Sequence, residues 1–94
     1  MGVIFEWDPL PLKAIANLQK HSVSFEEAST TFADPLSSTI HDPNHSNQED
    51  RYILMGYSLY HRLIVVAFTE RSHKFRIISA RLATSHEPKD YENA

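Results

Sequence analysis

The sequence predicts an α+β domain, in which helices pack on one face of an antiparallel sheet of about four to five strands. Two segments with helical signals lie in the N-terminal half, and three apolar, strand-like segments follow one another in the C-terminal half. The connections between those strands are too short for crossovers, so neighbouring strands are expected to pair antiparallel. A chain of 94 residues, 41% of them hydrophobic, can bury one modest core, so residues 1–94 are predicted to form a single domain.

The chain is expected to begin with one short strand and a first helix. Residues 3–7 form an apolar run that indicates a strand. Asp8 and Pro9 interrupt this run, because Asp is a good helix N-cap and Pro suits a first helical turn. The helix is expected from about Leu12 to His21. Its apolar stripe, the face that such a helix turns toward a core, consists of Leu12, Ile15, Ala16 and Leu18.

A second helix is marked at both ends. Ser24 and Glu27 have the spacing of a capping box, in which the cap hydroxyl and the third-position carboxylate satisfy each other's backbone N–H groups. Asp34 and Pro35 end the pattern, since the residue before a proline disfavours helical backbone. The helix is therefore predicted over residues 25–33. Its buried stripe consists of Phe25, Ala28 and Phe32.

The C-terminal half is predicted to form the sheet. Residues 36–40 are expected to form an edge strand, and the polar residues 41–50 an exposed loop. Three strands follow over residues 51–58, 62–70 and about 73–81. Residues 64–68 are apolar on both faces, which suits a central strand. A short last helix is expected from His86 to about Asn93.

Charge is distributed unevenly. The segment from Arg51 to Arg81 contains six Lys and Arg residues and one acid, Glu70, so its net charge is +5. The remainder of the chain contains three Lys and Arg residues and eleven acids, so its net charge is −8. The two parts sum to −3. A basic segment on an acidic body indicates an anionic ligand at one site. The alternative, equally weighted from the charges alone, is that these cations only solvate one face of the sheet.

The arginines of this segment are candidates for a phosphate clamp, because the planar guanidinium fork matches a phosphate and stays charged. Arg76 and Arg81 are five positions apart, so a regular strand would point them to opposite faces, although Arg81 lies where the strand ends. The alternative is structural pairing with acids, which at least one arginine is expected to make. The acids considered as partners are Glu6, Asp8 and Glu70.

Lys20 and His21, at the predicted end of the first helix, are candidates for proton transfer and phosphate binding. Histidine suits proton transfer near neutral pH. Cations at a helix C-terminus also complement the helix dipole, and that structural explanation is the more common one. Glu70 and Glu87 are possible general bases, but a carboxylate beside arginines has a lowered pKa, so ion pairing is the preferred interpretation for both.

Several classes of function are disfavoured. Pro43 separates His41 from His45, so the two cannot share a helical face, and there is no cysteine; no metal site or other cofactor is expected. Two glycines cannot build a Gly-rich phosphate loop or a serine-nucleophile elbow. No apolar run approaches the roughly 20 residues that span a bilayer, so a cytoplasmic protein without a membrane partner is expected.

Several separate motifs, in order, resemble the BrnT family of toxins from bacterial type II toxin–antitoxin modules. Residues 20–28 resemble its Lys-His-Gly-Val-Ser-Phe-Glu-Glu-Ala signature, with Ser22 in place of the glycine. Pro88 stands where the family usually has arginine. The remaining similar segments are residues 5–8, Lys13 and Asn17, residues 34–35, 69–71 and 76–81, and the closing residues 87–91.

The resemblance implies a RelE-like fold and a ribonuclease that arrests translation. It also implies neutralisation by a BrnA-type ribbon-helix-helix antitoxin, with promoter DNA bound only indirectly through that antitoxin. Cleavage of RNA without a metal needs proton transfer at the 2′-OH and cations at the phosphate. The residues assigned to these roles are Lys20 or His21 for proton transfer, Arg76 and Arg81 for the phosphate, and Arg51, Arg71 and Lys74 for substrate binding.

Two non-catalytic alternatives remain open. In one, the basic sheet face only docks an acidic partner. In the other, the chain is a degenerate toxin that acts as a co-repressor with its antitoxin, an idea to which Ser22 and Pro88 lend some weight.

Overall fold

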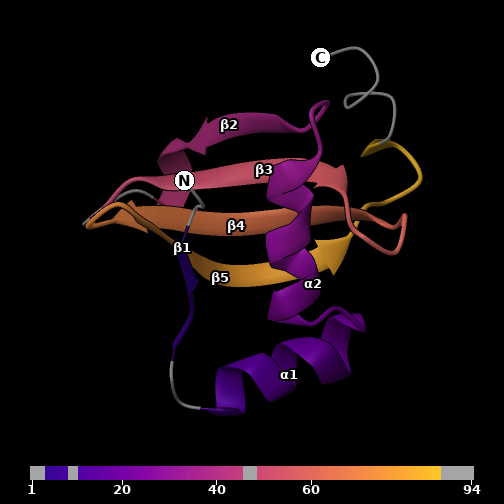
Figure 1. The fold of residues 1–94 in the computed structure, drawn as a ribbon, viewed down its shortest axis with the longest axis horizontal. Helices are drawn as coiled ribbons and strands as arrows, with labels where there is room; N and C mark the ends of the chain where they lie inside the picture. The colour runs from indigo at the N-terminus through magenta and orange to yellow at the C-terminus, as the bar shows by residue number, and fades with distance from the viewer. Residues whose placement is uncertain (1–3, 9–10, 46–48, 88–94) are drawn as a thin grey trace.

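A twisted five-stranded sheet forms the centre of the structure, with one helix across a face and another along an edge (Figure 1). The computed structural model describes residues 4–8, 11–45 and 49–87. The strand order is β1-β5-β4-β3-β2, and the predicted α+β class is confirmed. In chain order the elements are β1 (Ile4–Glu6), α1 (Pro11–His21), α2 (Phe25–Thr30), η1 (Thr31–Ala33), β2 (Ser38–Asp42), η2 (Pro43–His45), β3 (Arg51–Tyr57), β4 (Leu63–Arg71) and β5 (Lys74–Leu82).

Strands β2 to β5 form the antiparallel meander that the short connections predicted. The sheet as a whole is mixed, however, because β1 pairs parallel with β5, with Glu6 opposite Arg76. The expectation of a purely antiparallel sheet is therefore wrong for one strand. Nearly the whole chain lies between β1 and β5, so no short connection fixes their relative direction.

A β-bulge in β5 changes which side chains share a face. Ala67 of β4 lies opposite Ser79, whereas Phe68 lies opposite Ile77, so Ile78 is the extra residue. A bulge of this kind shifts the alternation of faces by one position. Consequently Arg76 and Arg81 point to the same face of the sheet, and the prediction from a regular strand that they point to opposite faces is wrong.

Helix α2 covers the other face and supplies much of the core. The Ser24 side chain caps it by accepting a 3.0 Å hydrogen bond from the Glu27 backbone N–H. Phe25 and Ala28 are buried as predicted, and Phe32 packs against the core from η1. The α-helix ends at Thr30 and continues as a single 3-10 turn, three residues earlier than expected. The core contains Val23, Phe25, Ala28, Ile64, Val66, Ile77 and Ala80.

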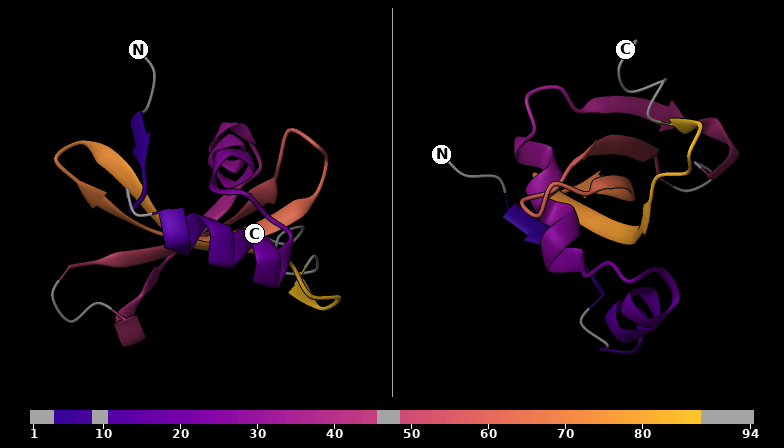
Figure 2. Two further views of the ribbon diagram at one scale, coloured as in Figure 1. Left: turned by 90° about the horizontal axis from the view of Figure 1, so that it is seen from below. Right: turned by 90° about the vertical axis from the view of Figure 1, so that its right-hand side faces the viewer.

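Helix α1 lies along the edge of β5 and not on the face covered by α2 (Figures 1 and 2). The predicted stripe is consequently exposed: Leu12, Ile15 and Leu18 keep 74%, 48% and 50% of their surface accessible. Ala16 is exposed as well. The side that faces the sheet carries Ala14 and the buried Asn17 instead. The placement of both helices on one face is therefore corrected for α1.

Asn17 joins α1 to the sheet at a point where β5 would otherwise lack a neighbour. Strand β1 reaches along β5 only as far as Arg76. Beyond it, the Asn17 amide donates to the Ala80 carbonyl oxygen (2.9 Å) and accepts from the Ala80 backbone N–H (3.1 Å). Its Nδ2 also donates to the carbonyl oxygen of Val23 (2.9 Å). The side chain thus takes the place of a partner strand and satisfies backbone groups that burial would leave unpaired.

The end of the chain is only partly described. The predicted last helix over residues 86–93 lies almost entirely outside the described residues. Within those residues, no helix is long and apolar enough to cross a membrane.

Candidate active site

The sheet face opposite α2 carries the cations that the sequence singled out. Arg51 and Arg76 both lie opposite Thr69, Arg81 lies opposite Val65, and Arg71 lies opposite Lys74. Directly opposed residues of antiparallel strands point to the same side, and the bulge brings Arg76 and Arg81 into step. The five cations therefore share one face of the sheet.

One hollow on this face is lined by side chains that could take part in catalysis. Its volume is about 230 Å³, and its polar lining consists of His21, Ser79, Arg81 and Glu87. Ile53, Val65 and Ala67 form an apolar floor. The residues come from α1, three strands and the segment after β5, so only the folded chain brings them together.

The edge position of α1 brings His21 into this hollow. His21 is the last residue of α1 and is half-buried. The next residue, Ser22, has a φ of 58°, and its backbone N–H donates to the carbonyl oxygen of Leu18 (2.8 Å). This left-handed residue ends the helix directly after His21 and turns the chain toward α2. A helix lying over the α2-covered face could not place its last residue on the opposite face.

Arg81 and Glu87 form a two-pronged ion pair in the hollow. Nη1 donates to Oε1 at 2.8 Å and Nη2 to Oε2 at 2.9 Å, while Oε1 also accepts from the backbone N–H of Thr84. The Arg81 guanidinium, helped by Thr84, lowers the pKa of Glu87 to about 2, and Glu87 raises the pKa of Arg81. Glu87 is thus a weak base that occupies the fork to which a phosphate could bind.

The other predicted cations lie outside this hollow. Arg76 donates to Glu6 (2.8 Å), so the expected structural pairing is confirmed for that arginine. Arg51 and Arg76 flank Thr69, whose buried Oγ1 has no hydrogen-bond partner in the described part of the chain. Arg71 pairs with Glu49 (2.8 Å) near the exposed Lys74. Lys20 is exposed and does not line the hollow.

Among the residues that the structure describes, two of the predicted ion-pair partners, Asp8 and Glu70, lie in other surroundings. Asp8 pairs with Lys13 at 3.4 Å. Glu70 points to the face covered by α2, because it lies between Thr69 and Arg71 on a regular part of β4. The expectation that Glu70 pairs with a neighbouring arginine is therefore wrong.

Two polar residues of the hollow, Ser79 and Glu87, were not among the predicted site residues. Ser79 lies in segment 76–81, which resembles the BrnT family, but the direction of its side chain depends on the bulge beside it. Glu87 had been interpreted only as an ion-pair partner, which it is. The signal that could have found it is its place in the closing segment that resembles the BrnT family.

A partly buried ion pair near this site was also missed. The Glu27 carboxylate accepts hydrogen bonds from the Arg62 guanidinium and from Ser58 Oγ (2.7 Å), and Arg62 donates to the Ser22 carbonyl oxygen (2.8 Å). Arg62 lowers the pKa of Glu27. Only half of the predicted capping box forms, because this carboxylate turns to Arg62. The network ties α2 and the turn after His21 to the β3–β4 loop.

The described residues include no group of three or more His, Cys, Asp or Glu side chains placed to hold a metal ion. The ring of His41 contacts Asp50 at 3.0 Å, and the side chain of His45 lies outside the described part. The absence of a metal or other cofactor remains a prediction.

Comparison with known proteins gives one family and one informative structure. The family model for the ribonuclease toxin BrnT of type II toxin–antitoxin systems matches residues 7–87. The crystal structure of the ribonuclease toxin BrnT from Brucella abortus superimposes with a TM-score of 0.62 at 22% identity, covering 89% of this chain and 100% of that one. At this identity the likeness supports the fold alone. Comparison with curated protein sequences gives no match.

Proposed function

Because the chain belongs to the BrnT family of ribonuclease toxins from type II toxin–antitoxin systems, we propose that it cleaves RNA without a metal ion, at the hollow between α1 and β5. The observation that carries this proposal is that His21 and Arg81 line the same hollow. They are one proton-transfer candidate and one phosphate-binding candidate, and they lie 60 positions apart in the chain (81 − 21).

In the proposed reaction, His21 takes the proton of a ribose 2′-OH, and the 2′-oxygen attacks the adjacent phosphorus. The bond from phosphorus to the 5′-oxygen breaks, and that oxygen receives a proton from solvent, because Lys20, the other predicted proton-transfer candidate, is exposed outside the hollow. The products are a 2′,3′-cyclic phosphate and a 5′-hydroxyl. Arg81 stabilises the charge that develops on the phosphoryl oxygens. The need for a 2′-OH restricts the substrate to RNA.

The Glu87 carboxylate holds the Arg81 fork in place in the free protein, and an RNA phosphate replaces it. Arg51 and Arg76 lie on the same face, at the far end of the strands, where they can bind flanking phosphates. Arg71 and Lys74 extend this basic face to the β4–β5 turn. In this proposal the fold is RelE-like, the protein acts in the cytoplasm, and a BrnA-type ribbon-helix-helix antitoxin neutralises it and alone contacts promoter DNA.

The test is incubation of the purified protein with a defined RNA in EDTA, first without and then with ribosomes. We expect Arg81→Ala and His21→Ala to lower the cleavage rate at least about 100-fold, the usual effect of losing a charge stabiliser or a proton-transfer group. Lys13→Ala, which removes an exposed cation of α1 outside the hollow, is the matched control and should cleave like the wild type. Circular dichroism shows whether each variant is folded.

Cleavage by folded Arg81→Ala and His21→Ala at the wild-type rate would exclude this hollow as the site. A non-catalytic role is the second candidate, and one observation favours it: Glu87 already occupies the Arg81 fork. The chain would then be a docking module or a degenerate toxin that acts as a co-repressor. A folded wild type that cleaves no RNA and does not inhibit growth when expressed alone would support that role.

A further inference from the structure

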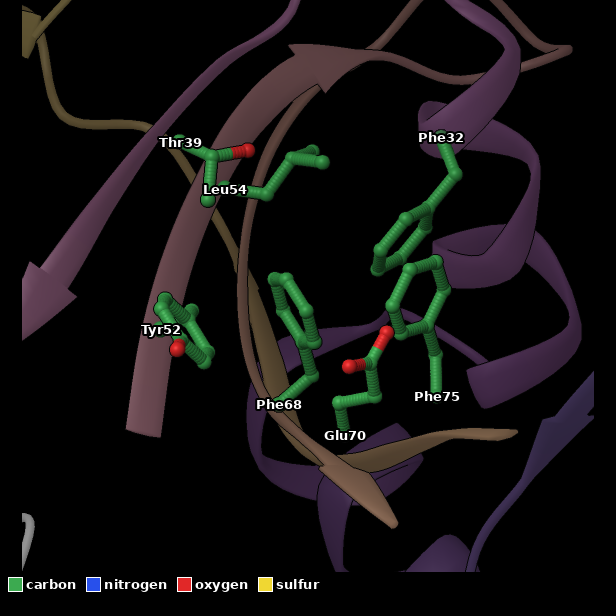
Figure 3. A pocket seen from close by; sticks show the side chains of 7 residues that line it. All are labelled: Phe32, Thr39, Tyr52, Leu54, Phe68, Glu70 and Phe75. Atoms are coloured by element: carbon green, nitrogen blue, oxygen red, sulfur yellow. The ribbon is translucent and has the colours of Figure 1, made fainter. Parts of the chain in front are cut away.

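A second hollow lies on the opposite side of the sheet, on the face that α2 covers only in part (Figure 3). Its volume is about 320 Å³, at the lower end of the range for ligand pockets. Its lining includes four aromatic rings, two hydroxyl groups and one carboxylate, from Phe32, Tyr52, Phe68, Phe75, Thr39 and Glu70. It shares no lining residue with the hollow assigned to RNA cleavage.

The rings form a fixed cluster. Phe32 stacks on Phe75 with 5.2 Å between ring centroids, and Phe68 meets Phe32 edge-on at 4.9 Å. Tyr52 continues the row at 5.6 Å from Phe68. Of these four rings only Phe68 is buried, with 5% of its surface accessible, whereas the other three are half-buried. The cluster therefore presents ring surfaces whose positions are set by packing before any ligand binds.

Glu70 brings a negative charge to this aromatic surface. It lies opposite Phe75 in the β4–β5 register, and its side chain extends toward that ring (Figure 3). The carboxylate is exposed, and in the described part of the chain it has neither an ion pair nor a hydrogen bond. The alternation of faces explains this: the neighbouring cations Arg71 and Arg76 point to the other side of the sheet.

Aromatic faces together with an unpaired carboxylate select a cation. A guanidinium or ammonium group gains a cation–π interaction with the rings and an ion pair with the acid. A neutral apolar ligand would remove the carboxylate from water without a partner, which is unfavourable. An anionic ligand such as RNA would be repelled.

We propose that this hollow docks a lysine or arginine side chain of a partner polypeptide. A polypeptide is the expected occupant because the chain belongs to a family of type II toxins, and such toxins are made together with an antitoxin protein. The docked segment binds on the face opposite the proposed RNA site. A segment docked there does not itself cover the hollow of His21 and Arg81.

The test uses a library of random ten-residue peptides displayed on phage, selected on the purified wild-type protein. We expect the selected peptides to be enriched in Lys and Arg, and to bind Glu70→Gln about tenfold more weakly than the wild type. Glu26→Gln is the matched control: it removes the same charge from an exposed site on α2, outside the hollow, and should bind like the wild type.

A second pair of variants tests the place of binding. Thr39→Lys puts a tethered cation at the rim of the hollow and should abolish peptide binding. Ile40→Lys adds the same charge to the opposite face of β2 and should not. Thermal unfolding verifies that all four variants are folded.

Several outcomes would overturn the proposal. They are selected peptides without cation enrichment, equal binding to wild type and Glu70→Gln, or binding of N-acetyl-arginine amide as tight as that of the peptides, which would indicate a site for a free small cation. None of these measurements depends on RNA cleavage. A protein that binds the peptides and cleaves no RNA would contradict the proposed function and leave this inference standing.

Discussion

At the scale of single residues, the backbone at Ser22 decides how α1 passes into α2. Its φ of 58° lies in the left-handed region, which costs an L-residue with a Cβ atom about 1–2 kcal/mol and costs glycine nothing. Ser22 stands where the BrnT signature has glycine, the residue that adopts this conformation without strain. In the structure Ser22 nevertheless adopts the left-handed conformation, at the cost of this strain. The helix therefore ends directly after His21, and His21 lies in the hollow.

We therefore expect Ser22→Gly to stabilise the protein. The gain should be about 0.5–1 kcal/mol, because relief of strain is partly offset by the larger backbone entropy of glycine in the unfolded chain. Urea unfolding monitored by circular dichroism measures it. Ser29→Gly, the same change inside α2, should instead lower stability by a similar amount. If both substitutions destabilise equally, strain at Ser22 is not the cause.

At the scale of elements, the sequence predicted those whose partners are close along the chain. The helix capped by Ser24 and the meander of β2 to β5 follow from local capping and short connections. The position of α1 does not follow from local signals. Its larger apolar side chains predict a buried face, but in the structure that face is exposed. Asn17 is buried only because the distant Ala80 offers backbone groups that its amide can satisfy. The sequence around Asn17 does not predict this contact with Ala80.

Prediction of the site from the sequence was limited in the same way, because the site also depends on contacts between distant segments. His21 and Arg81 could be selected as chemically suitable, but their meeting depends on α1 lying at the edge of β5. The relation of Arg76 to Arg81 depends on the bulge at Ile78, and no glycine or proline marks that position. A single inserted residue moves all following side chains of a strand to the other face of the sheet. Whether such a bulge forms is decided by packing across the sheet.

The α1–β5 contact gives a test at this scale. Asn17→Ala should lower the free energy of unfolding by about 2–4 kcal/mol, because three backbone groups in a buried region lose their hydrogen bonds. Gln19→Ala, an exposed position on the same helix, is the control and should change stability by less than about 0.5 kcal/mol. Faster hydrogen exchange at the Ala80 amide would locate the loss, and unchanged exchange there would contradict this account.

At the scale of the whole molecule, charge is arranged by pairing across long stretches of chain. The basic segment could be seen in the sequence, but the acids that pair with it in the described ranges include Glu6, Glu27, Glu49 and Glu87, which come from four different parts of the chain. These pairs have a consequence for stability. Arg62 lowers the pKa of Glu27, and Arg81 lowers that of Glu87 to about 2, so both carboxylates bind protons less readily in the folded state than in the unfolded one.

The stability provided by the Arg81–Glu87 pair should therefore be complete above the ordinary glutamate pKa of 4.5 and be lost as the pH falls toward about 2. At pH 7, we expect Glu87→Gln to lower the free energy of unfolding by only about 1 kcal/mol, because the Arg81 side chain is 42% exposed and solvent screens the pair. Urea unfolding at pH 7, 5, 3.5 and 2.5 should show the gap between wild type and variant narrowing below about pH 4.5. Glu26→Gln, an exposed glutamate of α2, should show no such change. A gap of constant size at every pH would mean that Glu87 supports the fold through hydrogen bonds such as the one from Thr84, and not through its charge.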